Sequence, residues 1–189
     1  MSDEPTRAQS ALHLIVGELE AVLGRLESAE LEELAQAVTD ADRVFVHGAG
    51  RSGIALRMTA MRLMHLGLTV HVVGETTTPA IETGDILLVA SGSGTTAGIV
   101  AAAEAAGKAG ARIAALTTAR ESTLAALADV VVVIPAAAKL DRSGSASEQY
   151  AGSLFEQAVA LVGDAVFHSL WKRSGQSADD MWPRHANIE

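Results

Sequence analysis

The chain has 189 residues, of which 49% are apolar and only 3% aromatic, and it carries a formal net charge of −9 with no cysteine. This length and composition predict one α/β domain with an aliphatic core. The acidic balance argues against nucleic acid as a partner, and the absence of cysteine excludes disulfides, thiolate catalysis and cysteine metal sites.

The chain shows neither a signal peptide nor a membrane segment. Its N-terminus is acidic and lacks a basic and then apolar pattern. No apolar run approaches the roughly 20 residues that a membrane helix requires. We therefore expect a cytoplasmic protein with no membrane partner.

Two helices are predicted before any strand, at residues 8–26 and 31–41, from apolar residues at helical spacing. Their apolar stripes must pack either on the sheet that follows or on another subunit. We therefore expect residues 1–42 to form an N-terminal helical segment and residues 43–189 to form the main domain.

From residue 43 onward, strands alternate with helices. Strands are predicted at residues 43–46, 68–73, 85–90, 112–116 and 130–134, and helices at 52–66, 96–109, 123–126 and 148–172. This order predicts a three-layer, doubly wound, five-stranded parallel sheet of the flavodoxin-like type. Ligands of such sheets bind beyond the carboxyl ends of the strands.

Two turns rich in glycine and hydroxyl residues fall at those strand ends. Residues 48–53 read Gly-Ala-Gly-Arg-Ser-Gly and residues 91–96 read Ser-Gly-Ser-Gly-Thr-Thr, each between a strand and a helix. Helix N-termini offer free amide hydrogens and a partial positive charge, so both turns suit a phosphate group. The candidate phosphate-binding residues are Gly50, Arg51, Ser52, Ser91, Gly92, Ser93, Gly94, Thr95 and Thr96.

Each turn also has an alternative interpretation. The first is a G-x-G-x-x-G sequence with Glu75 at the end of the next strand, as in dinucleotide-binding folds. In the second, Ser and Thr are common helix N-caps and need no ligand.

With these turns placed, the chain resembles the sugar isomerase (SIS) domain family, and within it the 6-phospho-3-hexuloisomerase branch. The resemblance lies in residues 48–53, 60–67, 91–96, 149–157 and 184–189. It implies a phosphosugar-binding domain that interconverts D-arabino-3-hexulose 6-phosphate and D-fructose 6-phosphate in the ribulose monophosphate pathway of formaldehyde fixation. It further implies no metal or cofactor, a homotetramer with sites near subunit contacts, and coupling to 3-hexulose-6-phosphate synthase.

Moving the ketone from C3 to C2 requires one base that removes a proton from C2 and returns it to C3 through a cis-enediol. The resemblance assigns this role to Glu156, which without it would be interpreted as a solvated helix residue. His65 and His185 are candidate proton donors near the oxygens, and His185 could reach a neighbouring subunit's site. His65 could equally be a packed core or interface residue.

Two other functions remain open at this point. One is a non-catalytic sugar-phosphate sensor of the same fold, and the other is an isomerase of a different sugar phosphate. The chain has no basic DNA-binding helix of the kind that such sensors usually carry.

Overall fold

The computed structural model describes residues 6–137 and 147–188. At its centre lies a parallel sheet with the strand order β2-β1-β3-β4-β5. The strands are β1 (Val44–Gly48), β2 (Val70–Val72), β3 (Ile86–Ala90), β4 (Arg112–Thr117) and β5 (Val130–Val133). The Val, Ile, Leu and Ala residues of β1, β3 and β4 are buried on both faces, as expected for a parallel sheet covered on two sides, whereas those of the edge strands β2 and β5 are wholly or partly half-buried. The predicted fold class is confirmed.

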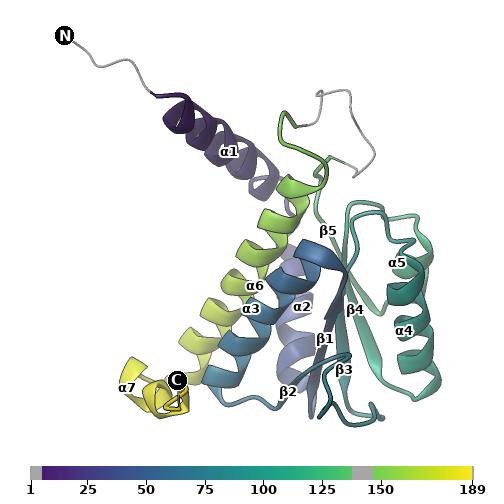
Figure 1. Ribbon diagram of the computed structural model, residues 1–189. Helices are drawn as coiled ribbons and strands as arrows, with labels where there is room; N and C mark the ends of the chain where they lie inside the picture. The colour runs from purple at the N-terminus through teal and green to yellow at the C-terminus, as the bar shows by residue number, and fades with distance from the viewer. Residues whose placement is uncertain (1–5, 138–146, 189) are drawn as a thin grey trace.

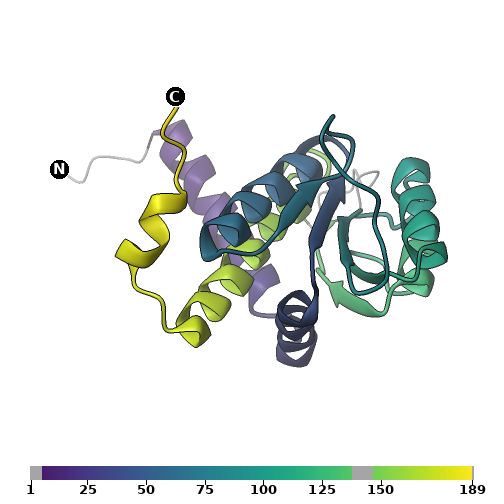
Figure 2. The ribbon, with the colours of Figure 1, turned by 90° about the horizontal axis from the view of Figure 1, so that it is seen from below.

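Helices cover the two faces in separate layers (Figures 1 and 2). One face carries α2 (Ser28–Asp40), α3 (Gly50–Leu66) and α6 (Ser153–Ser174), and the other carries α4 (Ala97–Lys108) and α5 (Thr123–Leu127). The three-layer arrangement follows from the alternation of strand and helix along the chain.

The two ends of the chain lie outside this sandwich. α1 (Arg7–Leu23) contacts α6 and extends away from the sheet, whereas α2 packs into the core through Leu34, Ala35 and Val38. Near the other end, α7 (Ala178–Met181) and the 3₁₀ turn η1 (Trp182–Arg184) lie at the C-terminal end of α3 (Figure 1). Within the described residues, no helix is long and apolar enough to span a membrane.

The winding reverses between β1 and β3. The connection from β1 leads outward to β2, and the next strand returns to the opposite side of β1. At such a point the loops diverge and leave a crevice. Gly48 and Gly53 close the β1–α3 turn tightly, because a Cβ on Gly53 would lie 2.3 Å from the carbonyl oxygen of Gly48.

α3 and α6 run side by side from the crevice toward the opposite end of the domain (Figure 1). They approach closely where Gly163 of α6 faces the buried Thr59 of α3. A Cβ on Gly163 would lie 2.0 Å from Thr59 Oγ1. The missing side chain at position 163 therefore sets how near the two helices come.

Several predicted boundaries differ from the structure, and two of them bear on the site. α3 begins at Gly50, two residues earlier than expected, so that Arg51 is helical. α6 begins at Ser153, five residues later than expected, because Ala151 has a φ of 52° and interrupts the helix. The sequence also predicts a loop rich in serine and glycine at residues 140–147, of which residues 140–146 lie outside the described residues.

Candidate active site

A cavity of about 410 Å³ opens at the carboxyl ends of β1 and β3. Both predicted turns contribute to it, and so does the start of α6, which is distant in sequence. Its lining residues are Ala49, Ser52, Ala90, Gly92, Ser93, Thr95, Thr96, Ala137, Gly152, Phe155 and Glu156. The two turns therefore meet around one space, as the parallel topology requires.

Three helix N-termini converge on this cavity. The N-cap residues of α3, α4 and α6 are Ala49, Thr96 and Gly152, and all three line it. Within the described residues, none of these N-caps bonds its side chain to the first turn of its helix, whereas α1, α5 and α7 are capped by Thr6, Ser122 and Ser177. Uncapped N-termini retain free amide donors and positive dipole ends, which together suit an anion.

The hydroxyls of the second turn bond to one another instead of to the helix. Thr96 is the N-cap of α4, yet its Oγ1 lies 2.9 Å from the hydroxyl of the buried Ser91. The Thr95 hydroxyl donates to Ser93 Oγ at 3.1 Å. The interpretation of these residues as side-chain N-caps is therefore wrong.

The turn between β3 and α4 is fixed by contacts with residues that follow β4. Gly94 has a φ of 62°, and a Cβ there would lie 2.0 Å from Ser122 Oγ. The carbonyl of Gly92 accepts hydrogen bonds from the amide and hydroxyl of Thr118 at 3.0 and 2.8 Å. The backbone of the turn is thus fixed, while Ser93, Thr95 and Thr96 stay exposed toward the cavity.

Arg51 and Glu156 form an ion pair at the cavity rim. Arg51 Nε lies 2.5 Å from Glu156 Oε2. The Glu156 side chain is 20% exposed and that of Arg51 62% exposed, so the carboxylate is held and the guanidinium reaches solvent. A second hollow of about 320 Å³ lies on the far side of this pair, between α3 and α6. Glu156 lines both spaces.

His65 and His185 lie together, but at the other end of α3. Their ring centroids are 3.9 Å apart, and the ring of His185 also contacts that of Trp182, tilted by 50° with the centroids 4.7 Å apart. His65 lies fourteen residues after Arg51 on one helix, which corresponds to about 20 Å at 1.5 Å per residue. Within one chain, the structure therefore brings Arg51, Ser52 and residues 91–96 to Glu156 but leaves both histidines remote from it.

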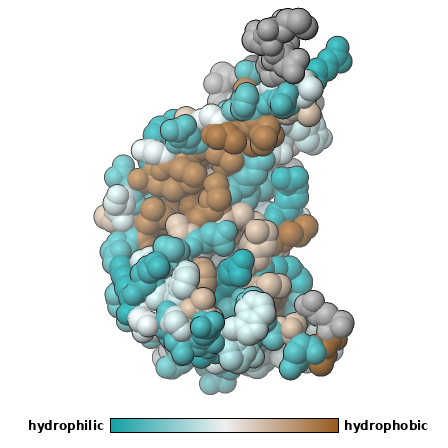
Figure 3. Space-filling model, turned by 90° about the vertical axis from the view of Figure 1, so that its left-hand side faces the viewer, coloured by the Kyte–Doolittle hydropathy of each residue, from teal (hydrophilic) through white to brown (hydrophobic). Residues whose placement is uncertain are grey.

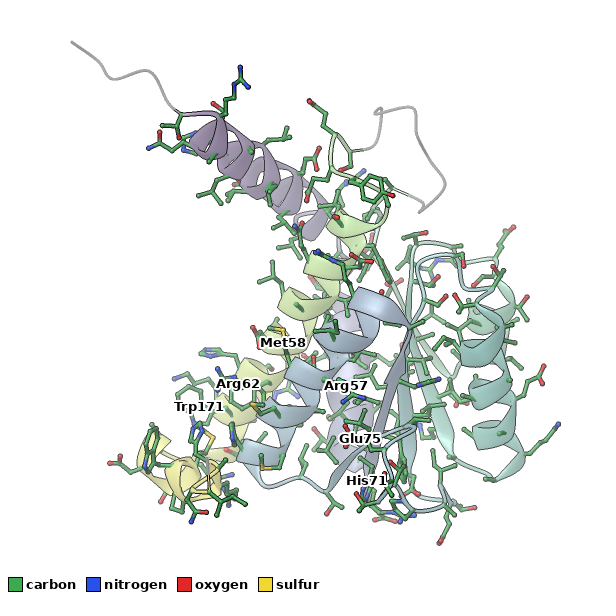
Figure 4. The ribbon with its side chains drawn as sticks, viewed as in Figure 1. Arg57, Met58, Arg62, His71, Glu75 and Trp171 are labelled. Carbon is green, nitrogen blue, oxygen red and sulfur yellow. The ribbon has the colours of Figure 1, made fainter. Side chains whose placement is uncertain are left out.

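Glu75 forms an ion pair with an arginine of α3 in this structure. The Glu75 carboxylate accepts a hydrogen bond from Arg57 Nη1 at 2.5 Å. Arg57 lies on α3, more than one helical turn beyond the glycines of the β1–α3 turn. Figure 4 shows both side chains on the sheet side of α3. The glycines at 48 and 53 serve the tight packing of the turn.

Comparison with known proteins places the fold in a family. A family model for the SIS domain matches residues 37–159. The chain belongs to the SIS domain family. It is 57% identical over 178 residues to the 3-hexulose-6-phosphate isomerase of Mycobacterium gastri, covering 94% of this chain and 89% of that one. It is 37% identical to the Bacillus subtilis enzyme of the same name, covering 93% and 95%.

A solved structure supports the same grouping. A protein from Methanococcus jannaschii, whose crystal structure is described as inferring a 3-hexulose-6-phosphate isomerase function, superimposes with a TM-score of 0.81. The two are 28% identical, and the match covers 95% of this chain and 99% of that one.

Three contributors to the cavity of this SIS domain escaped the sequence analysis. Phe155 presents its ring to Gly92, where a Cβ would lie 3.4 Å from Phe155 Cδ1. Gly152 supplies the third helix N-terminus, and Ala137 closes another side. Phe155 belongs to residues 149–157, which carry part of the family resemblance, but only the fold shows that its aromatic ring forms a cavity wall.

Proposed function

We propose that this SIS-domain protein is a 3-hexulose-6-phosphate isomerase, which interconverts D-arabino-3-hexulose 6-phosphate and D-fructose 6-phosphate in the ribulose monophosphate pathway. One observation carries the proposal: three uncapped helix N-termini face the same cavity, and Glu156 is the one carboxylate among the described residues that line it. The 57% identity to a 3-hexulose-6-phosphate isomerase supports the choice of substrate.

The phosphate group binds at residues 91–96 and at the first turns of α3 and α4. Backbone amides there and the exposed hydroxyls of Ser93, Thr95 and Thr96 supply the donors. In a chain of charge −9, this dipolar site holds an anion without a cluster of cations. Arg51, at the rim, contacts the phosphate or the sugar hydroxyls.

Glu156 is the base. It removes the proton from C2, the C2–H electron pair forms the C2=C3 bond, and the C3 carbonyl oxygen takes up the charge and then a proton. The resulting cis-enediol loses a hydroxyl proton at O2 and regains a proton at C3 from the same carboxyl group. One base on one face serves both transfers, and donors near O2 and O3 lower the barrier.

The site is completed by a second copy of the chain. The face seen in Figure 3 carries a broad apolar patch. Exposed apolar side chains on α1, α3 and α6 include Leu12, Val16, Ile54, Met58, Met61 and Leu161. Figure 4 shows Met58 and Arg62 on the side of α3 that is turned away from the sheet. Such a patch, next to a functional cavity, marks a subunit interface.

The symmetry of such an interface would place the two histidines of one subunit near the cavity of its neighbour. In a two-fold dimer, both copies use the same patch. When the two-fold axis is perpendicular to a helix of that patch, the rotation reverses the helix direction, so the two copies of the helix run antiparallel. The C-terminal end of one α3, with His65 and His185, then lies beside the N-terminal end of the other, with Arg51. The proposed assembly is a tetramer, and His65 or His185 of one subunit donates a proton in its neighbour's site.

The direct test supplies ribulose 5-phosphate, formaldehyde and 3-hexulose-6-phosphate synthase, and measures fructose 6-phosphate. The folded protein is expected to form fructose 6-phosphate at a rate proportional to its own concentration. Folded protein that forms none would overturn the proposal. Tight fructose 6-phosphate binding without turnover would indicate a sensor, and faster turnover of arabinose 5-phosphate would indicate another isomerase.

A further inference from the structure

Glu18, on the N-terminal helix α1, holds the segment that leads into α6. Its carboxylate accepts hydrogen bonds from Ser147 Oγ at 2.7 Å, from the Glu148 amide at 2.7 Å and from Gln149 Nε2 at 2.9 Å. Burial alone would raise the pKa of Glu18, but these three hydrogen bonds outweigh it and lower the pKa below the ordinary value of 4.5. One side chain thus fixes three consecutive residues more than 120 positions away.

The chain between this clamp and the cavity is strained. Ala151 has a φ of 52°, the only positive φ of a non-glycine residue among those described. A left-handed alanine is energetically unfavourable and persists only where its surroundings impose it. Upstream lies the Glu18 clamp, and downstream Ser153 donates its amide and hydroxyl to the carbonyl of Tyr150.

The backbone conformation of Ala151 sets the position of the cavity wall that α6 provides. Gly152 follows Ala151 directly, is the N-cap of α6 and lines the cavity. Its carbonyl accepts the amide of Glu156 at 3.1 Å. The position of the first turn of α6, and with it the Glu156 carboxylate, therefore depends on how residues 147–151 are held.

We propose that Glu18 is a positioning residue for the isomerase reaction, which holds residues 147–149 so that the turn at Ala151 presents Gly152 and Glu156 to the substrate. This inference rests on the proposed function. Among the described residues, the hydrogen bonds of the Glu18 carboxylate go to residues 147–149 and not to the turn at residues 91–96, so the phosphate site does not depend on it. Its loss is expected to affect turnover rather than phosphate binding.

The test compares Glu18→Ala with Glu20→Ala in the full-length protein. Glu20 lies on the same helix and is exposed, and no hydrogen bond or ion pair of its side chain is found in the described part of the chain. Glu18→Ala is expected to lower kcat about tenfold with KM within about twofold, because small displacements of a reacting group are costly. Glu20→Ala is expected to match the wild type.

Two further variants separate positioning from general stability. Glu18→Gln keeps the length of the side chain, and its amide can bond to the same groups, since Ser147 and Gln149 can reverse their roles as donors and acceptors. It should therefore recover most of kcat. Glu18→Asp is shorter by one methylene and should not, and it serves as the second variant if Glu18→Ala fails to fold.

A readout independent of activity keeps the two proposals distinguishable. Amide hydrogen exchange at Glu148 should accelerate in Glu18→Ala and stay unchanged in Glu20→Ala, whether or not the wild type turns over a hexulose phosphate. Equal kcat for Glu18→Ala and Glu20→Ala at a temperature where both are folded would overturn the role of Glu18. A wild type without turnover would instead refute the proposed function.

Discussion

Arg51 Nε lies 2.5 Å from Glu156 Oε2, and this contact joins the first turns of two helices whose N-termini both face one cavity. The carboxylate is mostly buried and the guanidinium mostly exposed. In the absence of substrate, Arg51 thus orients the proposed base. When a sugar enters, the exposed guanidinium of Arg51 can turn toward a phosphate or hydroxyl, which releases the Glu156 carboxylate to act on the substrate.

Replacing Glu156 by Gln is expected to lower kcat at least about 10³-fold, because the amide cannot accept the C2 proton. The fructose 6-phosphate Kd should stay within a few-fold, since phosphate donors lie on other residues. Steady-state kinetics and calorimetry measure both, with Glu104→Gln on the exposed face of α4 as the matched loss of charge. Substantial turnover by the Glu156→Gln variant would remove Glu156 as the base.

Replacing Arg51 by Met is expected to lower kcat/KM by about 10–100-fold, because the base loses its orienting partner and the sugar loses a cation. Arg51→Lys should recover only part, since lysine lacks the planar donor fork. Arg57→Met is the control, because Arg57 lies on the same helix but pairs with Glu75 outside the cavity. Comparable losses in both methionine variants would contradict a specific role for Arg51.

Mixing two impaired variants is expected to restore activity if subunits share sites. A hybrid of Glu156→Gln and His65→Ala subunits contains sites with an intact Glu156 from one chain and an intact His65 from the other. After unfolding and joint refolding, activity should exceed the sum of the separately refolded variants. Strictly additive activities would argue that each chain acts alone.

We also expect His65→Ala alone to lower kcat in the forward direction less than Glu156→Gln does. The phosphate on O6 prevents the 3-hexulose from closing a five-membered ring, so no acid is needed to open one.

Replacing Gly94 by Ala is expected to destabilise the protein by about 2–4 kcal/mol, because the new Cβ would collide with Ser122 and the left-handed φ of 62° disfavours alanine. Urea unfolding measures the loss. Gly17→Ala is the opposite control, since no atom lies within 4 Å of a Cβ there and alanine favours the helix by about 0.5–1 kcal/mol. An unchanged Gly94→Ala midpoint would mean that the turn is more adaptable than the structure indicates.

Stability is expected to fall as the pH drops through the histidine range. Burial, with the positive charges of His185 and Arg62, lowers the pKa of His65 below its ordinary 6.5, and the Arg184 guanidinium also lies close, donating to the His65 carbonyl. The unfolded chain therefore binds more protons below pH 6.5, so the free energy of unfolding decreases from about pH 7.5 toward about pH 5.5. Urea denaturation across this range should show a shallower decrease for His65→Gln, and an identical slope would contradict the assignment.

The sequence predicted the order of strands and helices because short continuous apolar runs and the 3.6-residue apolar period are local properties. It also placed both glycine- and hydroxyl-rich turns at the strand ends where they meet around one cavity, because the residues between strand and helix are a local feature; their binding of phosphate stays a prediction. It misplaced the start of α6, because a clamp from Glu18 and a left-handed Ala151 are tertiary effects. The Arg51–Glu156 pair and the contact between the rings of His65 and His185 depend on which elements pack together, and spacing along the chain does not contain that information.

Gly163 controls the geometry of the active site from a distance. It lies seven residues, or about two helical turns, beyond Glu156, and any side chain there would push α6 away from Thr59. The gap between the two charged groups at the rim would then widen, although neither of them had been altered. Redesign of this enzyme for larger sugars could thus begin with a residue that no sugar ever touches.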